Sequence, residues 1–596
     1  MNFNYKKFAV SVLAFCVALS FCGCKSNKDN LNENGTNSTT NVTPAELNFT
    51  ENDMFTSGDT GTDDFSAAEQ ITLNGKTTTI SKAGSYVVSG EITDGQLIID
   101  ANSTDKIRIL LNGVNISSSD SAAIYIKQAD KVFITLASGK QNTLTNSGEF
   151  VSDGDTNVDA VVFSKDDLTF KGDGSLTVTT QNGHGIVIKD DLVFTGGNYN
   201  ITAASHAVSG KDSVRILNST LNADSGKDGI HAENSEDTSL GYVYIANGIF
   251  NITADGDGIS ASNGIQIDTA TVNIVTAGGA TETVNSNDFG MRPGYGYDTS
   301  EDTASTKGIK GTAGLQINGG TFNLDCEDDA LHSNSNLQIT SGDFTIKTGD
   351  DGIHADSALV ISGGNINILQ SYEGIEGLTI DINGGNIDIT ASDDGFNAAG
   401  GNDQSGFGGM RPDTFDSSSN SYIKITNGKI QIDAGGDGVD SNGALYVTGG
   451  ETYVSGPTNS GNGALDYGGN AQITGGIFVA TGALGMAANF SSAENQGCML
   501  LTFTSTTGDL TLKDESGKTL LTFSPGKNYG SAVISCPEIQ SGKNYTVIAG
   551  TNTVDVTMSG NIYSAGGGFG GGTPGGDFGG GGHGGGMRPS KYFSQN

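Results

Sequence analysis

Short runs of alternating apolar and polar residues, interrupted by glycine, recur along most of the chain. Examples are INGGTFNL, ITSGDFTI, ISGGNINI, INGGNIDI, ITNGKIQI, VTGGETYV and ITGGIFVA. Alternation on both sides of a glycine predicts a strand, a tight turn and a second strand. Because the apolar residues do not follow the spacing of an amphipathic helix, we expect an all-β protein.

A second phrase keeps the same repeat: an acidic residue, glycine, an apolar residue and a polar residue. Its apolar position falls at Val208, Ile230, Ile259, Ile309, Leu331, Ile353, Ile375, Phe396, Val439 and Leu465, with earlier members at Ile124, Val161 and Ile186 and a late one at Met486. The commonest spacing is 22 residues, and longer gaps contain insertions. Single hairpins of this length cannot bury a core, but stacked coils can. The repeat predicts a right-handed parallel β-helix over residues 66–490, with about 22 residues per coil.

The pattern changes after Cys498. MLLTFTS, LTLKD, LLTFS, AVIS, YTVIAG and VDVTM predict an antiparallel β segment within residues 491–563, which we expect to cap the C-terminal end of the stack. Residues 565–586 are mostly glycine, which predicts a disordered tail over residues 564–596.

The N-terminus predicts the location of the protein. Lys6 and Lys7 precede an apolar run that is too short to span a membrane, which indicates a signal peptide at residues 1–23. The run ends in Phe21-Cys22-Gly23-Cys24, which resembles a bacterial lipobox with Cys24 as the lipidated residue. Phe21 stands where leucine is usual, so simple secretion is the alternative. We expect residues 24–65 to be a disordered polar tether, and the protein to be extracellular, lipid-anchored to the bacterial cell membrane and displayed on the cell surface.

The net charge of the chain argues against some kinds of binding partner. The chain has 67 acidic and 30 basic residues and a formal net charge of -37. This balance repels nucleic acids and anionic membranes and attracts hard cations, so nucleic acid is not an expected partner and the lipid is the expected contact with the membrane. Three cysteines remain beyond the lipobox, Cys326, Cys498 and Cys536, and this odd number favours buried free thiols over a disulfide framework.

A row of titratable residues lies two positions before the apolar row: His184, His206, Asp228, Asp257, Lys307, Asp329, Asp351, Glu373, Asp394 and Asp437. The turn preference of Asp-Gly is one explanation, but it does not account for the additional acids at Asp328, Asp350 and Asp393. Carboxylates on neighbouring coils, about 5 Å apart, repel by roughly 3 kcal/mol at an effective dielectric of 20. Calcium suits such oxygen ligands, whereas zinc prefers a closed His and Cys set that this row lacks. The predicted calcium ligands are Asp328, Asp329, Asp350, Asp351, Glu373, Asp393 and Asp394.

A second polar row follows the apolar row by one position: His231, Ser260, Lys310, His332, His354, Glu376, Asn397, Asp440 and Asp466. Strand alternation places this row on the outer face, so we expect its histidines to face solvent as stacked neighbours. A polar strip beside a cation-rich corner fits a carbohydrate-binding face, and a solvated surface is the alternative. The candidate glycan-binding residues are Lys310, His332, His354, Tyr372, Glu376 and Asn397.

The DGIHA and SGGNINI coils, the lipobox, the terminal β segment and the glycine-rich inserts together resemble a carbohydrate-binding parallel β-helix family of clostridial cell surfaces. The resemblance spans about Phe65 to Tyr563. That family is similar in fold to family 9 polysaccharide lyases, and its described member binds calcium, cellulose and pectic, acidic sugars. The resemblance implies a calcium-dependent, non-catalytic polysaccharide-binding lipoprotein that binds plant cell-wall glycans such as cellulose or pectin.

Two alternatives stay open. A pectate-lyase-like eliminase needs calcium to neutralise a uronate and a basic residue to remove the proton alpha to it. Lys310 is the best candidate for that base and Lys307 the second, although a lysine among carboxylates keeps a high pKa unless calcium takes up their charge.

The other alternative is a surface structural or interaction protein. The tetrapeptide GMRP occurs three times outside the repeat, at Gly290–Pro293, Gly409–Pro412 and Gly586–Pro589. Three copies indicate either recombination of similar glycine-rich segments or recognition by a shared surface protein.

Overall fold

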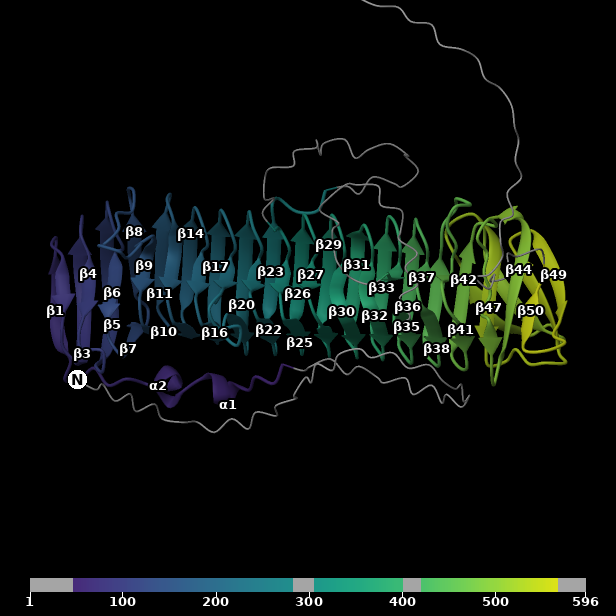
Figure 1. The fold of residues 1–596 in the computed structure, drawn as a ribbon, viewed down its shortest axis with the longest axis horizontal. Helices are drawn as coiled ribbons and strands as arrows, with labels where there is room; N and C mark the ends of the chain where they lie inside the picture. The colour runs from purple at the N-terminus through teal and green to yellow at the C-terminus, as the bar shows by residue number, and fades with distance from the viewer. Residues whose placement is uncertain (1–46, 282–304, 400–419, 566–596) are drawn as a thin grey trace, which may run out of the picture. The chain divides into compact units, whose positions relative to one another are not determined.

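The computed structural model describes residues 47–281, 305–399 and 420–565. All of them belong to the compact unit Pro44–Asn596. Strands make up most of this part, and its two helices, α1 (Glu51–Met54) and α2 (Ser57–Thr60), are a single turn each (Figure 1). The predicted all-β class is confirmed, and the described residues contain no helix long and apolar enough to cross a membrane.

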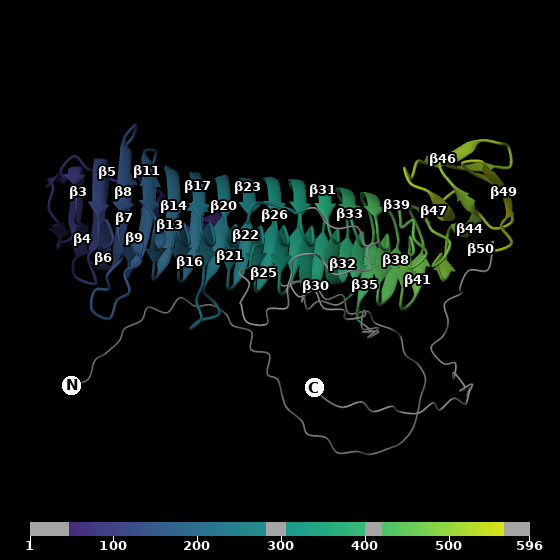
Figure 2. The same ribbon diagram turned by 90° about the horizontal axis from the view of Figure 1, so that it is seen from above.

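The strands stack side by side in three rows, and through most of the chain each strand pairs in parallel with the strand three places later (Figures 1 and 2). Row A holds β2 (Thr78–Ile80), β4 (Leu97–Asp100), β6 (Ile124–Gln128), β9 (Ala160–Ser164), β12 (His184–Ile188), β15 (Val208–Gly210), β18 (Ile230–Ala232), β21 (Ile259–Ala261), β24 (Ile309–Gly311), β27 (Leu331–Ser333), the first part of β30 (Ile353–Ile361) and of β32 (Ile375–Ile382), β34 (Phe396–Ala398), β37 (Val439–Ser441) and β40 (Asp466–Tyr467).

Row B holds β1 (Glu69–Asn74), β3 (Gly84–Ile92), the first part of β5 (Lys106–Ser118), β7 (Lys131–Leu136), β10 (Asp167–Gly172), β13 (Asp191–Thr195), β16 (Ser213–Leu217), β19 (Tyr242–Ile245), β22 (Gly264–Ile267), β25 (Gly314–Ile317), β28 (Leu337–Ile339), the ends of β30 and β32, β35 (Tyr422–Ile425), β38 (Ala444–Val447), β41 (Ala471–Ile473) and β43 (Ser492–Ala493).

Row C holds the end of β5, β8 (Gln141–Asn146), β11 (Ser175–Thr180), β14 (Asn198–Ala203), β17 (Ser219–Ser225), β20 (Gly248–Ala254), β23 (Thr271–Thr276), β26 (Thr321–Cys326), β29 (Asp343–Thr348), β31 (Asn365–Ser371), β33 (Asn386–Ala391), β36 (Lys429–Ala434), β39 (Glu451–Ser455) and β42 (Ile477–Gly482). Three rows of parallel strands that share one core are the arrangement expected of a parallel β-helix.

The apolar row of the repeat forms the inward face of row A. Leu331 pairs with Ile309 on one side and with Ile353 on the other, and all three side chains are fully buried. The large insertions leave this register intact, because strands on either side of them still pair. Two members of the predicted row are wrong. Val162, not Val161, pairs with Ile124, and Met486 lies outside the strands with 40% of its surface exposed.

Glycine has two different roles in the repeat. Gly364, in the SGG phrase between β30 and β31, has a φ of 102°, which favours glycine in the turn. Gly352, in DDGIHA, needs no such conformation, but a Cβ there would lie 2.6 Å from the carbonyl oxygen of Gly374 in the next coil. The glycine after the acid is therefore required for close approach of successive coils.

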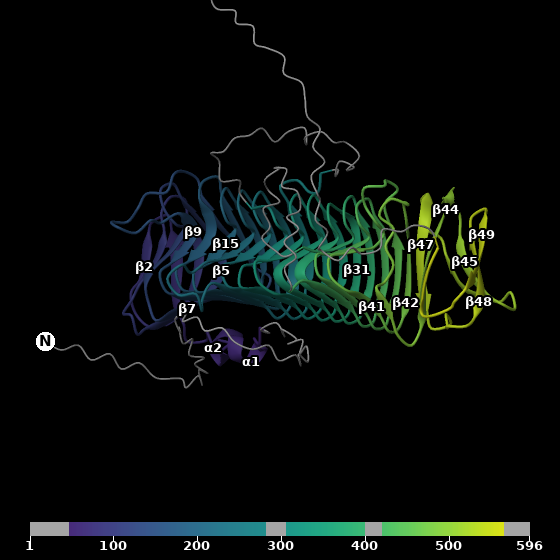
Figure 3. The ribbon, with the colours of Figure 1, turned by 45° about the vertical axis from the view of Figure 1, so that its right-hand side comes forward.

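Residues 47–65, expected to belong to a disordered tether, instead pack along row B (Figure 3). Asp59 in α2 is fully buried, with its Oδ1 2.9 Å from Lys131 Nζ and accepting a hydrogen bond from Thr169. Burial raises the pKa of Asp59, but these bonds outweigh it and lower the pKa to about 2. Phe55 adds apolar contact with Tyr244. The tether prediction is thus wrong for these residues, because local polarity does not reveal a charge that is paired by tertiary contacts.

At the C-terminal end, pairing becomes antiparallel. β47 (Tyr529–Cys536) pairs with β42 and with β44 (Gly497–Thr506), and β50 (Ile562–Ser564) adds to β44 in parallel. A separate antiparallel sheet holds β45 (Leu510–Asp514), β46 (Thr519–Phe523), β48 (Asn544–Ala549) and β49 (Asn552–Thr557). Most of these strands share a second core cluster. Cys326, Cys498 and Cys536 are buried free thiols, as predicted.

Candidate functional site: a polar column along row A

The two polar rows predicted from the sequence meet in the structure. Within three units of the repeat, the residue two before the apolar position contacts the residue one after it: Asp228 and His231 at 2.8 Å, Asp329 and His332 at 2.8 Å, and Asp351 and His354 at 2.9 Å. We call the joined rows the polar column: His184, His206, Asp228, His231, Asp257, Ser260, Lys307, Lys310, Asp329, His332, Asp351, His354, Glu373, Glu376, Asp394, Asn397, Asp437, Asp440 and Asp466.

The expectation that all these histidines face solvent is wrong. His332 is 1% exposed and His354 is 0% exposed. Alternation correctly places them outside the apolar core, but the preceding acid lies before the strand, where alternation does not set the direction of its side chain. The acid folds over the histidine, and the pair shields both groups from water.

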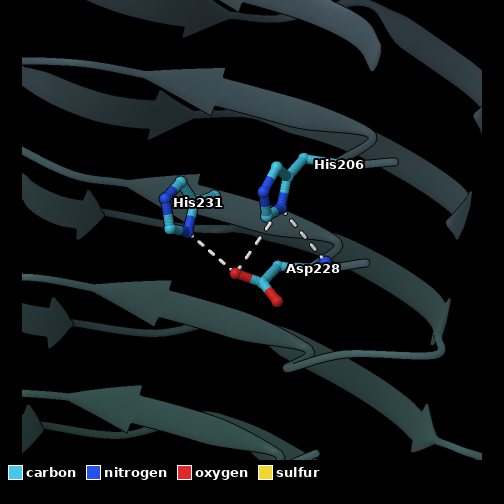
Figure 4. A group of neighbouring side chains, drawn as sticks. All are labelled: His206, Asp228 and His231. Carbon is cyan, nitrogen blue, oxygen red and sulfur yellow. Dashed lines mark hydrogen bonds and ion pairs between the residues drawn. The ribbon is translucent and has the colours of Figure 1, made fainter. Parts of the chain in front are cut away.

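The column begins with a stack of imidazole rings. The ring centroids of His184 and His206 are 5.1 Å apart. Those of His206 and His231, which Figure 4 shows, are 4.4 Å apart. Burial, together with the charge of His231, lowers the pKa of His206 to about 3. The pKa of His231 is instead raised, because its bonds to Asp228 and Glu233 outweigh burial.

Lysine is the counter-ion in the middle of the column. Lys307 Nζ lies 3.0 Å from Asp328 and 2.7 Å from Asp329. Burial raises the pKa of Asp329, but Lys307 and His332 outweigh this effect and hold the pKa below its usual range. Asp329 is therefore ionised, and Lys307 compensates its charge.

His354 gathers several acids. Its Nδ1 lies 2.9 Å from Asp351 and 2.8 Å from Glu376, and its Nε2 lies 3.1 Å from Asp356. Burial lowers the pKa of His354, but these bonds raise it far more, so the ring is a cation. Burial and the charge of Glu376 raise the pKa of Asp351 well above its usual value.

The last part of the column is dominated by acids. Burial and the charge of Glu376 raise the pKa of Glu373, and burial and the charge of Asp393 raise that of Asp394. Burial, Asp440 and Asp466 raise the pKa of Asp437 to about 8. The largest charge effects on these groups come from other carboxylates, so the acidic part must hold protons or cations.

The predicted calcium ligands are brought together in part. Asp328, Asp329 and Asp350 each place an oxygen within 4.8 Å of the others, and Asp351 forms a similar group with His354 and Glu376. Among the described residues, Glu373, Asp393 and Asp394 belong to no such group of three.

Two further groups were not among the predicted ligands. One is Asp437, Asp440 and Asp466, and the other is His206, Asp228 and His231. All six residues occupy the two polar rows. The sequence therefore contained these residues in its two polar rows, but it did not show that the two rows come into contact.

The predicted glycan-binding residues differ in accessibility. Tyr372 is 36% exposed, whereas Asn397 is 8% exposed and donates a hydrogen bond to Glu373 at 2.8 Å. Lys310 is half-buried and donates to Ser305 at 3.2 Å, and the side chain of Glu376 is 17% exposed. Tyr372, Lys310 and Glu376 are within reach of a ligand, whereas His332 and His354 lie beneath the surface. The three GMRP segments lie outside the described residues.

Comparisons with known proteins bear on the whole column. The chain matches a family model described as carbohydrate-binding domain-containing protein over residues 74–352 and 351–573. A protein of the same description from Acetivibrio thermocellus is 34% identical over 201 residues, which are 33% of this chain and 70% of that protein. A solved structure described as the polysaccharide lyase-like protein from C. thermocellum, in a gadolinium derivative, is 38% identical, covers 35% of this chain and 84% of its own, and has a TM-score of 0.33. The family model spans every residue of the polar column.

Proposed function

This chain belongs to the carbohydrate-binding domain family, and on that premise we propose that it is a calcium-dependent, non-catalytic polysaccharide-binding lipoprotein of the bacterial cell surface. The observation that carries the proposal is the polar column, which lines one row of the stack from His184 to Asp466. A long line of charged and hydrogen-bonding groups suits an extended, hydroxyl-rich chain better than a small ligand.

Calcium fits the acidic part of the column. Asp437, Asp440 and Asp466 each offer an oxygen within a space of 4.8 Å, and hard oxygen donors are the ligands that calcium prefers. Near Asp328 and Asp329, by contrast, Lys307 already supplies positive charge. We therefore propose the strongest calcium site at Asp437, Asp440 and Asp466 and weaker ones at the ligands predicted from the sequence, which lie between Asp328 and Asp394. Bound calcium would neutralise successive coils and attract the carboxylates of acidic sugars.

The glycan would contact the accessible members of the column. Tyr372 offers an aromatic face, and Lys310 and Glu376 offer a donor and an acceptor, next to the acidic part. The buried His332 and His354 would act by fixing the carboxylates around them. Plant cell-wall glycans such as cellulose and pectin are the proposed ligands, with pectin favoured by calcium because of its uronate groups.

The remaining features of the proposal concern the membrane anchor and the form of the stack. We propose lipidation at Cys24 after removal of residues 1–23, a right-handed winding of about 22 residues per coil, and a C-terminal cap formed by the antiparallel strands. Anchoring at Cys24 would leave the column free to meet extracellular polysaccharide. Detergent phase partitioning of the wild type and of Cys24→Ala tests the anchor, because only a lipidated chain moves into the detergent phase.

Pull-down with insoluble cellulose and cross-linked pectin, with calcium and with a chelator, tests the function. We expect retention with calcium, weaker retention with chelator, and a larger loss for Asp437→Asn/Asp466→Asn than for the control Asp388→Asn, whose exposed side chain lies in row C. Lack of retention of the wild type on every polysaccharide, in either condition, would refute the proposal. Absorbance of unsaturated uronate with polygalacturonate serves as a parallel assay, and activity abolished by Lys310→Ala would show a lyase instead.

The GMRP segments call for a separate test. We propose that they bind a surface protein that recognises this tetrapeptide. A chain in which Arg292, Arg411 and Arg588 are replaced by Ala should lose that co-purifying protein and keep glycan binding. Identical co-purification from both chains would count against the segments.

A further inference from the structure

His206, Asp228 and His231 bring two nitrogen donors and one oxygen donor together (Figure 4). Asp329, His332 and His354 offer the same donor types but are buried, whereas the group around Asp228 is partly exposed. His206 Nδ1 lies 3.5 Å from Asp228 Oδ2, and His231 Nδ1 lies 2.8 Å from the same oxygen. The group forms only because the two polar rows meet. His206 and Asp228 lie two residues before the apolar position in consecutive coils, and His231, in β18, lies one residue after it.

We propose that His206, Asp228 and His231 bind a divalent transition metal, Zn²⁺ being the ion of choice, through the two Nδ1 atoms and one carboxylate oxygen. Imidazole nitrogen and carboxylate oxygen are common zinc ligands, and three protein ligands leave a fourth position open. This inference goes beyond glycan binding and does not depend on the calcium sites, which use oxygen donors alone.

A hydrogen bond fixes Nδ1 of His206 in the unprotonated form that a metal requires. The backbone N–H of Asp228 donates to His206 Nδ1 at 3.2 Å, so this nitrogen carries a lone pair. That lone pair lies 3.5 Å from a carboxylate oxygen of the same residue. A metal ion bound here would take this lone pair from the backbone N–H of Asp228 and would offset the repulsion between the nitrogen and the carboxylate oxygen.

His231 has the support that metal-bound histidines usually show. Its Nε2 lies 3.3 Å from Glu233, which accepts the proton on that nitrogen. A histidine bound to metal through one nitrogen typically donates the other N–H to a carboxylate, and this fixes the ring. Ser260 Oγ donates to Asp228 Oδ2 at 2.6 Å and orients the carboxylate. The proton now shared by His231 Nδ1 and Asp228 would leave to solvent as the metal binds.

The distances are close to those of a tetrahedral site. Zinc bonds of about 2.0–2.1 Å place ligand atoms roughly 3.3–3.4 Å apart. The contact between His206 and Asp228 is already 3.5 Å, and that between His231 and Asp228, 2.8 Å, would lengthen by about 0.5 Å as its proton leaves. The three side chains are 15%, 14% and 20% exposed, so an ion reaches them from solvent.

Neighbouring charges set the selectivity. Asp257 and Glu233 favour a cation, whereas Lys227 opposes one. One carboxylate ligand makes a poor calcium site, because calcium takes six to eight oxygens, so we expect zinc to bind here in the presence of millimolar calcium. The polar column would then bind different cations at different places, zinc at a site with nitrogen ligands near its start and calcium at oxygen sites near its end.

Calorimetric titration of zinc into tag-free, chelator-treated protein in about 1 mM calcium tests the proposal. We expect about one ion per chain and a loss of affinity of at least tenfold in His206→Gln and in His231→Gln. The matched control is His184→Gln, since His184 stacks on His206 but lies outside the group. Absorption bands of tetrahedral Co²⁺ should appear in the wild type and in the control and weaken in both ligand variants. Equal zinc affinity in all four proteins would overturn the assignment.

A second measurement covers variants that fail to fold. Wild-type crystals soaked in zinc should show an anomalous peak between His206, Asp228 and His231 at the zinc absorption edge. A peak only at another position, or no peak at a zinc concentration that saturates the calorimetric titration, would refute the site without recourse to any variant.

Discussion

The two ends of the polar column share one backbone frame but differ in how their charges are balanced. From His184 to His354, a histidine contacts each of Asp228, Asp329 and Asp351, and Lys307 also contacts Asp329. At Glu373, Asp394 and Asp437 the largest charge effects come from other acids, although Glu376, in the same stretch, contacts a histidine, His354. The fold therefore tolerates either sign of charge at this corner, and the sequence of each coil decides whether the balance is internal or must come from solution.

The difference in charge balance suggests a structural role for the first part of the column and a binding role for the acidic part. The part of the column whose charges are balanced internally stabilises the stack and has less need of calcium. A column with raised carboxylate pKa values destabilises the stack until protons or cations arrive, and such a site gains the most from a ligand. The acidic part is therefore the part that we expect to respond to calcium and to acidic sugars.

Removal of the central carboxylate should give the largest effect. Asp329→Asn leaves Lys307 and His332 buried next to an uncharged side chain, and loss of one partner of a buried ion pair costs about 3–5 kcal/mol. We expect a decrease of about 3 kcal/mol in the free energy of unfolding, since Asp328 still contacts Lys307. Urea unfolding measures it.

The matched control is Asp328→Asn, whose side chain is 30% exposed and therefore better solvated. We expect it to cost about 1 kcal/mol or less. Equal losses for the two variants would contradict the view that the inner carboxylate holds the balance in the middle of the column.

Calcium should act on the acidic part with the next largest effect. An ion at about 100 times its dissociation constant stabilises the folded state by about 2.7 kcal/mol. We expect a gain of this size for the wild type and for Asp329→Asn, and little gain for Asp437→Asn/Asp466→Asn. Thermal unfolding with calcium and with chelator measures it, and an undiminished gain in the double variant would place the calcium elsewhere.

The sequence predicted the inward residues of the fold well. Leu331 and Ile353 could be placed because each repeats at a constant spacing and must be buried. Asp59 could not be placed from its surroundings, because the lysine and threonine that hold it lie far along the chain.

The candidate site was predicted less completely. The rows of Asp351 and of His354 were each identified, but their contact depends on a turn conformation that the two-residue period of a strand does not describe. Asp437 and Asp466 were members of those rows, yet without the structure nothing showed that they lie within one coordination distance. A periodic pattern gives the row of a residue but not the direction of its side chain beside a turn.

A change of pH should sharpen the comparison further. The pKa of Asp437 is about 8 in the folded chain and about 4 when unfolded, so between these values the folded state binds the extra proton. In chelator, stability should therefore fall as the pH rises from about 5 to 8, and Asp437→Asn should reduce the slope. Melting temperatures across this range measure it, and a slope that Asp437→Asn leaves unchanged would show that Asp437 is not the group that titrates.

With calcium the trend should weaken or reverse. Calcium requires ionised carboxylates, so its stabilising effect grows with pH. The middle of the column provides the internal reference, because Asp329 has a lowered pKa and stays ionised over this range.

The smallest effect concerns the accessible aromatic ring. Tyr372 is 36% exposed beside the acidic part, and its pKa is raised by burial and by Asp393. Tyr372→Ala should weaken retention on pectin by about tenfold or less, because one ring contributes roughly 0.5–1.5 kcal/mol. Tyr372→Phe keeps the ring and should retain nearly full binding, whereas Asp388→Asn should change nothing. Affinity gel electrophoresis with soluble pectin resolves differences of this size. Suppose that Tyr372→Ala binds as well as the wild type while Asp437→Asn/Asp466→Asn does not. The glycan is then recognised through cations bound to the column, and contact with the ring of Tyr372 contributes nothing.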